Sequence, residues 1–174
     1  MIKKIKISMS ERIILIFVVT LGVFTLISLI MLKNKCLFVK NYDPNNIEFD
    51  NPDNIVILNV NCGNIIIELY PNISPNAVKR LKKLIKLGVY DDAAFHRVIE
   101  GKLIQAGDLE FGKRENLDYG KVGTGKSGLG TIQSETNTKF KFERGSVGLA
   151  RTLQMNTEDS QFFIILQDEP LYEG

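Results

Sequence analysis

The feature that most constrains this chain is an unbroken apolar run, IILIFVVTLGVFTLISLIML, from Ile13 to Leu32. The run carries no charge, and as a helix rising 1.5 Å per residue it would be about 30 Å long, which is the thickness of a bilayer core. A buried core helix would have a polar face, whereas this run has only Thr20, Thr25 and Ser28 among its apolar residues. We therefore predict a transmembrane anchor over residues 13–32.

The alternative for the same run is a cleaved signal peptide. A signal peptide has a shorter apolar core and a small-x-small cleavage site, and the sequence MLKNKC at the end of the run offers neither. Four basic residues, Lys3, Lys4, Lys6 and Arg12, precede the run, and three, Lys33, Lys35 and Lys40, follow it. Because positive charge favours the cytoplasmic side, this predicts a single-pass protein whose remaining residues are extracytoplasmic, in a periplasm, an extracellular space or a secretory lumen.

The composition argues against several functions. The net charge of +2 is too close to balance for a nucleic-acid partner, which usually requires a basic face. One histidine, His96, and two cysteines, Cys36 and Cys62, do not supply the close set of about four ligands that a zinc site needs. The two cysteines could form one disulfide, but we do not expect it because Cys36 lies at the foot of the membrane segment.

A polar stretch over residues 33–54, rich in Asn, Asp and Pro, predicts a linker. The sequence IVILNVNCGNIIIELY, which begins at Ile55, has two apolar runs around a glycine-containing turn and predicts a β-hairpin. Ser74 and Pro75 predict the start of a helix, with Ser74 as its N-cap. The glycine-separated short segments that follow predict a mainly-β domain over residues 55–174, either an antiparallel barrel or an α+β fold.

The stretch GKVGTGKS, Gly120 to Ser127, matches the phosphate-loop pattern G-x-x-x-x-G-K-[ST]. A working loop joins a buried strand to a helix whose first N–H groups hold the phosphates. Here the preceding segment, FGKRENLDY, is charged, and the following segment, GLGTIQSETN, has two glycines that would each cost a helix about 1 kcal/mol. The apolar FFIILQDE, Phe162 to Glu169, resembles a magnesium-binding strand, but no parallel sheet can join the two. We therefore predict a long surface loop and no nucleotide partner.

Three further motifs lie in order along the domain. They are VYDDAAFHRVIEGKLIQAGD (Val89 to Asp108), ERGSVGLART (Glu143 to Thr152) and DSQFFI (Asp159 to Ile164). They resemble the patterns YDGxxFHRVIxGFMxQGGD, RGxxxMAR and SQFFI of the cyclophilin family of peptidyl-prolyl isomerases, and ART at 150–152 is closer to its bacterial branch. The resemblance covers residues 55–174 and implies a cyclophilin-like antiparallel β-barrel with a capping helix.

The resemblance implies an enzyme that rotates X-Pro peptide bonds, without a cofactor. The amide C–N bond has double-bond character, so this rotation meets a barrier of about 18–20 kcal/mol and takes tens to hundreds of seconds uncatalysed. Arg97 matches the family's catalytic arginine, and a permanently charged guanidinium suits a donor to the prolyl nitrogen. Gln105 would hold the substrate backbone, whereas we interpret His96 as structural because the rotation transfers no proton. The other substrate-binding residues that the resemblance implies are Phe95, Lys102, Leu103, Ala150, Arg151, Thr152, Phe163, Leu171 and Tyr172.

The sequence also departs from the family pattern. Lys102 stands where the family has the Phe of the pocket floor, and Leu171 stands where many members carry a Trp, so we do not expect tight cyclosporin binding. The family continues beyond Gly174 with further strands, an active-site His and a second helix, and we expect the barrel to be incomplete at its C-terminal end. The sequence therefore predicts a membrane-anchored isomerase acting on proline-containing unfolded or flexible polypeptides. A non-catalytic proline-peptide binding module is the alternative.

Overall fold

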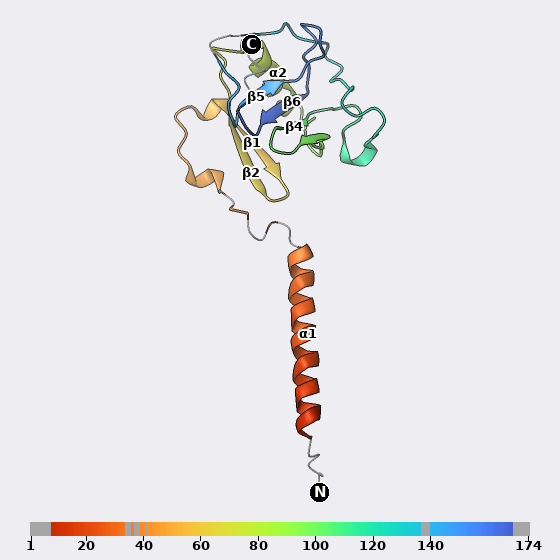
Figure 1. The fold of residues 1–174 in the computed structure, drawn as a ribbon. Helices are drawn as coiled ribbons and strands as arrows, with labels where there is room; N and C mark the ends of the chain where they lie inside the picture. The colour runs from red at the N-terminus through yellow and green to blue at the C-terminus, as the bar shows by residue number, and fades with distance from the viewer. Residues whose placement is uncertain (1–7, 34–35, 37–38, 41, 137–139, 169–174) are drawn as a thin grey trace. The chain divides into compact units, whose positions relative to one another are not determined.

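The structure of the protein is a computed structural model, and it forms two compact units, which we describe separately (Figure 1). The first consists of residues 1–49 and 57–66, and the second of residues 50–56 and 67–174. The residues that the structure describes are 8–33, 36, 39–40, 42–136 and 140–168.

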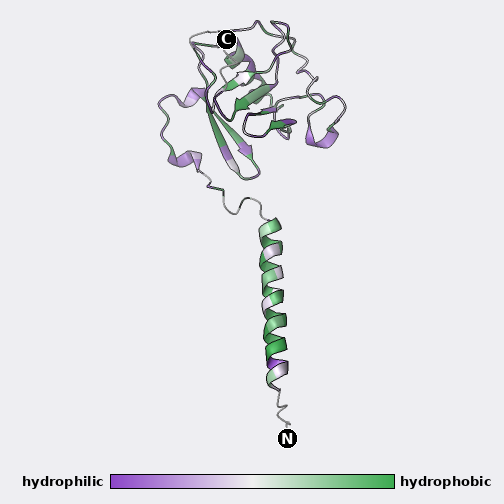
Figure 2. Ribbon diagram, in the orientation of Figure 1, coloured by the Kyte–Doolittle hydropathy of each residue, from purple (hydrophilic) through white to green (hydrophobic). Residues whose placement is uncertain are grey.

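The first unit contains the long helix α1, Met9–Lys33. None of its residues is buried, and Figure 2 shows apolar residues along almost its whole length. The hydroxyls of Thr20 and Thr25 donate to the carbonyls of Phe17 and Gly22 at 2.9 Å, so these polar groups are satisfied within the helix. α1 is long and apolar enough to cross a membrane, and a signal sequence would share both properties.

The first unit also contains a disulfide between Cys36 and Cys62, whose Cα atoms are 5.0 Å apart. Cys62 lies in the turn between β1 (Ile55–Val60) and β2 (Gly63–Glu68), which pair as the predicted hairpin. Our expectation that the two cysteines would not pair was wrong. A disulfide needs only that the two Cα atoms approach within about 7 Å, and a position close behind a helix end does not prevent that approach.

The second unit contains the helix α2, Pro75–Lys86, which begins where the sequence predicted. Ser74 occupies the N-cap position, but its side chain makes no capping hydrogen bond. The carboxylate of Glu135 caps the helix instead, since it accepts from the backbone N–H groups of Asn76 at 2.8 Å and Ala77 at 3.0 Å. The predicted helix start with Ser74 at the N-cap is confirmed, but the hydrogen bonds that cap the first turn go to Glu135 and not to the Ser74 side chain.

A four-stranded sheet forms the centre of this unit, in the order β3, β4, β6, β5 with every neighbouring pair antiparallel. Its strands are β3 (Arg97–Ile99), β4 (Leu103–Ala106), β5 (Val147–Leu149) and β6 (Phe162–Ile165). Apolar side chains of the two inner strands and of α2 make the core. The buried apolar residues in these three elements are Val78, Leu84, Leu103, Ala106, Phe162, Ile164 and Ile165.

Within the described residues the strands form two separate sheets and no closed barrel, so the predicted barrel, which we expected to be incomplete at its C-terminal end, is not itself confirmed. The two helices, of 25 and 12 residues, also contain more residues than the six short strands there. Where the structure describes it, the long segment between β4 and β5 is mostly irregular, with the short 3₁₀ turn Arg114–Asn116 and no strand that could join the two sheets. Many of its backbone N–H groups donate to side-chain carboxylates rather than to a neighbouring strand, as described below.

Candidate functional site

One row of residues crosses the four-stranded sheet. Arg97 lies opposite Gln105, Gln105 opposite Phe163, and Phe163 opposite Gly148. Residues directly opposite each other in a sheet project from the same face. The row therefore places a guanidinium, an amide, an aromatic ring and a glycine next to one another in that order. All four residues line a pocket of about 650 Å³.

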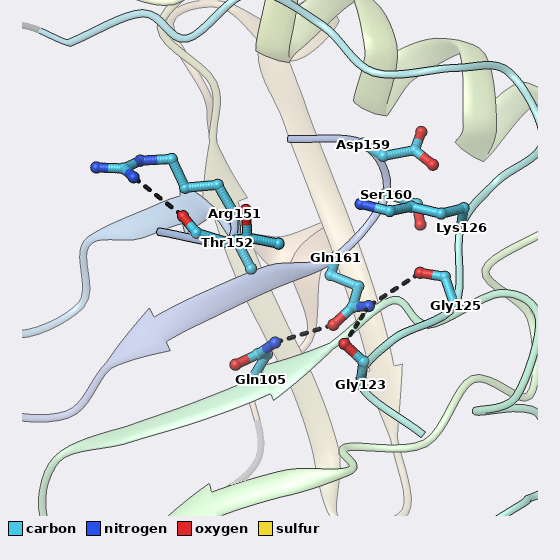
Figure 3. Close-up of a pocket in the computed structure, with 10 residues that line it drawn as sticks. Gln105, Gly123, Gly125, Lys126, Arg151, Thr152, Asp159, Ser160 and Gln161 are labelled. Atoms are coloured by element: carbon cyan, nitrogen blue, oxygen red, sulfur yellow. Dashed lines mark hydrogen bonds between the residues drawn. The ribbon is translucent and has the colours of Figure 1, made fainter. Parts of the chain in front are cut away.

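A chain of hydrogen bonds orders the polar end of this row. Arg97 Nη1 donates to Gln105 Oε1 at 3.2 Å, and Gln105 Nε2 donates to Gln161 Oε1 at 2.9 Å. Gln161 Nε2 in turn donates to the carbonyls of Gly123 and Gly125 at 3.0 Å each, as Figure 3 shows. Gln161 is buried and its amide is held in one orientation. Its hydrogen bond orients the Gln105 amide, which in turn orients the Arg97 guanidinium.

Sequence reasoning did not single out Gln161, although it lies inside the motif DSQFFI. A polar residue directly before an apolar strand is a signal that could have identified it. The apolar end of the pocket holds another residue that the motifs missed. Phe142 packs on Phe163 with their ring centroids 5.4 Å apart and their planes tilted by 37°. Leu103, which is 3% exposed, lines the same pocket.

The predicted rim residues Ala150, Arg151 and Thr152 lie together. They line both the large pocket and a smaller one of about 80 Å³. Figure 3 shows Arg151 and Thr152 at the smaller pocket. Arg151 Nη1 donates to the carbonyl of Thr152 at 3.0 Å, and its Nε is 3.7 Å from Glu158 Oε1. Glu158 also accepts from Ser134 Oγ at 2.6 and 2.8 Å, so the charge at this rim is paired.

Two of the predicted residues are not in this group. Lys102 and Phe95 line neither of the two pockets, and Lys102 is exposed in the turn between β3 and β4. The backbone carbonyl of Lys102 accepts from Leu166 N at 2.7 Å, so a backbone hydrogen bond to the chain after β6 holds this turn. Leu171 and Tyr172 lie outside the described residues.

His96 lies beside the row, and both of its ring nitrogens are buried without a hydrogen-bond partner among the described residues. A Cβ built on Gly123 would lie 3.7 Å from His96 Cδ2, so the ring packs against the Gly-rich loop. In the part of the chain that the structure describes, no three His, Cys, Asp or Glu residues are grouped to hold a metal ion.

The loop that matches the phosphate pattern is wrapped around carboxylates of its own chain. Asp108 is completely buried, and its Oδ2 accepts from the N–H groups of Gly123 at 2.7 Å and Gly125 at 2.9 Å. Its Oδ1 accepts from Glu110 N at 3.1 Å and Phe111 N at 2.8 Å. Burial by itself would raise the pKa of Asp108, but the four N–H donors outweigh it and hold this pKa below its usual value.

Asp159 holds the end of the same loop. It accepts from the N–H of Ser127 at 2.6 Å and from the Ser127 hydroxyl at 2.5 Å, and it forms a buried ion pair with Arg80. Lys126, the lysine of the pattern, donates to the carbonyl of Thr157 at 3.1 Å. The loop N–H groups and the lysine that would hold phosphates in a nucleotide-binding loop therefore already donate to Asp108, Asp159 and Thr157 of this chain. These hydrogen bonds hold the loop in place.

A pocket on the sheet with a guanidinium at one end and an apolar wall at the other fits a chain segment that is partly apolar, and comparison with known proteins gives the class. Residues 55–174 match the family model described as cyclophilin type peptidyl-prolyl cis-trans isomerase/CLD. The chain belongs to this family.

Individual relatives agree with the family match. The chain is 42% identical over 124 residues to a probable peptidyl-prolyl cis-trans isomerase of Brucella suis, which covers 71% of this chain and 63% of the relative. It is similar to a cyclophilin of Cryptosporidium parvum with 30% identity and a TM-score of 0.57, covering 66% of this chain and 67% of that one. The structure of the Cryptosporidium protein in the presence of the dipeptide Ala-Pro matches with a TM-score of 0.56 and 29% identity, over 66% of this chain and 68% of that one. The chain thus spans less than two thirds of the length of the curated Brucella relative.

Proposed function

We propose that this chain is a peptidyl-prolyl cis-trans isomerase that accelerates X-Pro rotation in unfolded or flexible polypeptides during protein folding. The observation that carries the proposal is the row across the sheet, because it puts Arg97 in the same pocket as the aromatic ring of Phe163, with Gln105 between them. The Ala-Pro dipeptide present with the Cryptosporidium cyclophilin supports a proline-containing substrate.

In this reaction no covalent bond forms or breaks. The only electronic change is the temporary loss of amide conjugation. The proline ring would rest on Phe163 and Leu103, while Gln105 would hold the substrate backbone. As the C–N bond twists, the lone pair of the prolyl nitrogen localises and becomes a hydrogen-bond acceptor. Arg97 would donate to that nitrogen, and a donor already ordered by Gln105 costs little reorganisation at the moment of rotation.

We propose further that residues 13–32 anchor the chain, residues 33–54 link the anchor to the isomerase domain, and residues 55–174 are extracytoplasmic. The disulfide supports this side of the membrane, because disulfides persist in oxidising compartments and are rare in the cytosol. A membrane-impermeant maleimide should label the cysteines of intact cells only after treatment with an impermeant reductant. Labelling that requires cell lysis, with or without reductant, would contradict this orientation.

The isomerase proposal is tested by measuring cis–trans exchange of a tetrapeptide containing Ala-Pro by NMR, with the full chain in detergent micelles. We expect Arg97→Ala to lower kcat/KM about 10²- to 10³-fold, as for the loss of one preorganised donor. Arg114→Ala is the matched control, since Arg114 is 77% exposed and should change nothing. Wild-type chain that binds the peptide without accelerating its exchange would favour the non-catalytic binding module instead.

A further inference from the structure

The apolar side of the pocket depends on a residue that no motif contains. Gly148 ends the row across the sheet and leaves a gap next to the ring of Phe163. Phe142 fills this gap from the segment that leads into β5, and a Cβ on Gly148 would lie only 3.0 Å from Phe142 Cε1 and 2.7 Å from Phe163 Cζ. The two rings therefore make one continuous aromatic surface, and Gly148 is the position that lets them meet.

This surface lies where a proline ring would have to bind. Both rings line the 650 Å³ pocket, and they share it with Arg97 and Gln105 at the other end of the row. Aromatic rings present a negative face, and the CH groups next to an amide nitrogen carry partial positive charge, so a proline ring is a good partner for them. Aromatic-lined grooves are a general means of binding proline-rich segments.

The residue expected to supply an aromatic group at this site does not do so. Position 102 is a lysine, it is exposed, and it lines neither pocket. Phe142 is half-buried and already ordered by its contact with Phe163, whose centroid is 5.4 Å away. The second aromatic ring of this pocket thus comes from the segment before β5 and not from the turn before β4.

We propose that Phe142 is a substrate-binding residue that takes the proline ring together with Phe163 and sets the preference of the pocket for proline. This inference rests on the proposed function of the pocket. It assigns Phe142 to binding and not to the rotation step, because its ring packs on Phe163 and beside Gly148, at the opposite end of the row from Arg97.

The test compares Phe142→Ala and Phe142→Leu with wild type, using the full chain in detergent micelles and the Ala-Pro tetrapeptide. We expect Phe142→Ala to raise both the Kd of the peptide and KM about tenfold while kcat stays within about twofold. Phe142→Leu keeps an apolar group and the fold, and should raise Kd about threefold. Phe140→Ala is the matched control, because Phe140 is 52% exposed and lines neither pocket.

Two results would overturn the inference: an unchanged Kd in both Phe142 variants, or a fall in kcat with KM unchanged. Binding is measured separately from exchange, so the two proposals fail differently. Wild-type chain that binds the peptide without speeding its exchange removes the isomerase proposal, and the Kd of the variants still decides the role of Phe142. Wild-type chain that binds no proline peptide removes both.

Discussion

At the scale of single residues, Gly148 shows that an absent side chain can shape a site. Its importance does not come from an unusual backbone conformation. It comes from the close approach of the Phe142 and Phe163 rings to its Cα, which any Cβ would prevent. The pocket therefore needs glycine at this strand position even though glycine weakens strands in general.

We expect Gly148→Ala to lower the free energy of unfolding by about 1–3 kcal/mol, because a methyl group would overpack against both rings. The same variant should weaken peptide binding, since the rings must move apart to admit the methyl group. Urea unfolding and peptide titration would measure the two effects. Gly120→Ala is the control, because its nearest contact would be Asp118 Oδ1 at 3.4 Å, and a loss as large there would contradict the argument.

Residues inside linear motifs could be predicted from the sequence, and residues assembled only by the fold could not. Arg97, Gln105 and Phe163 were predicted, and their strands bring them into one row. Phe142 was not predicted, because its place in the pocket depends on the register between β5 and β6 and on the gap at Gly148. No pattern along the chain encodes that contact.

At the scale of secondary-structure elements, the N-terminus of α2 depends on a residue far away in the sequence. The first turn of a helix has N–H groups without partners inside the helix, and a local Ser at the N-cap usually accepts from one of them. Here Glu135 accepts from two of them and also adds a negative charge at the positive end of the helix dipole. The helix is therefore stabilised by the long segment between β4 and β5.

We expect Glu135→Gln to lower the free energy of unfolding by about 1 kcal/mol, and Ser74→Ala to change it by less than about 0.5 kcal/mol. From the sequence alone, Ser74→Ala would be expected to cost more stability than Glu135→Gln, because Ser74 is at the N-cap. The structure predicts the opposite order. Urea denaturation of the two variants would measure it. A larger effect for Ser74→Ala would mean that the serine caps the helix after all.

The Gly-rich segment is the second element whose order depends on a carboxylate. Asp108 has a lowered pKa, so its contribution to stability is complete above the pKa of the unfolded state, which is close to 4, and is lost as the pH falls through the lower pKa of the folded state. We expect the free energy of unfolding to be steady above about pH 5 and to fall below about pH 4.

We expect Asp108→Asn to remove this acid-sensitive contribution and to cost about 2–5 kcal/mol at neutral pH, because an NH₂ group would face N–H donors. Unfolding free energies measured between pH 2 and 7 for wild type, Asp108→Asn and the exposed control Asp91→Asn would check the assignment. An acid-sensitive stability that persists in Asp108→Asn would assign it to another group.

The hairpin and α2 were predicted because their signals are local: alternating apolar runs around a turn, and a Ser-Pro start followed by helical spacing. The barrel was not confirmed, and the local structure of the segment between β4 and β5 could not be predicted either, because within the described residues it contains no strand. Its N–H groups bind Asp108, Asp159 and their neighbours, and hydrogen bonds of this kind are set by tertiary contacts that no period along the chain reveals.

At the scale of the whole molecule, the disulfide is the feature that we did not expect from the sequence. It joins Cys36, close behind α1, to the turn of the hairpin and closes a loop with a sequence separation of 26. Closing a loop of that length reduces the entropy of the unfolded chain and stabilises the folded one by about 3–4 kcal/mol.

We expect Cys36→Ser and Cys62→Ser each to lower the free energy of unfolding of the oxidised chain by about 3 kcal/mol, and the double variant to lose no more than either single one. Adding dithiothreitol to wild type should have the same effect and should leave the variants unchanged. Additive losses in the double variant would show that the two sulfurs act independently and are not bonded.

The Gly-rich loop has one more consequence, for how its match to the phosphate pattern should be understood. In the language of host–guest chemistry, the loop is an oxyanion host whose guest is covalently attached to the same molecule, at a very high effective concentration. Removing the carboxylate, as in Asp108→Gly, would leave an empty space of its size. The four backbone N–H groups that now donate to Asp108, those of Glu110, Phe111, Gly123 and Gly125, would surround that space. Formate or acetate in solution could then occupy this space, and formate would restore the lost stability by chemical rescue. The loop resembles a nucleotide-binding loop because both surround an anion with backbone N–H groups.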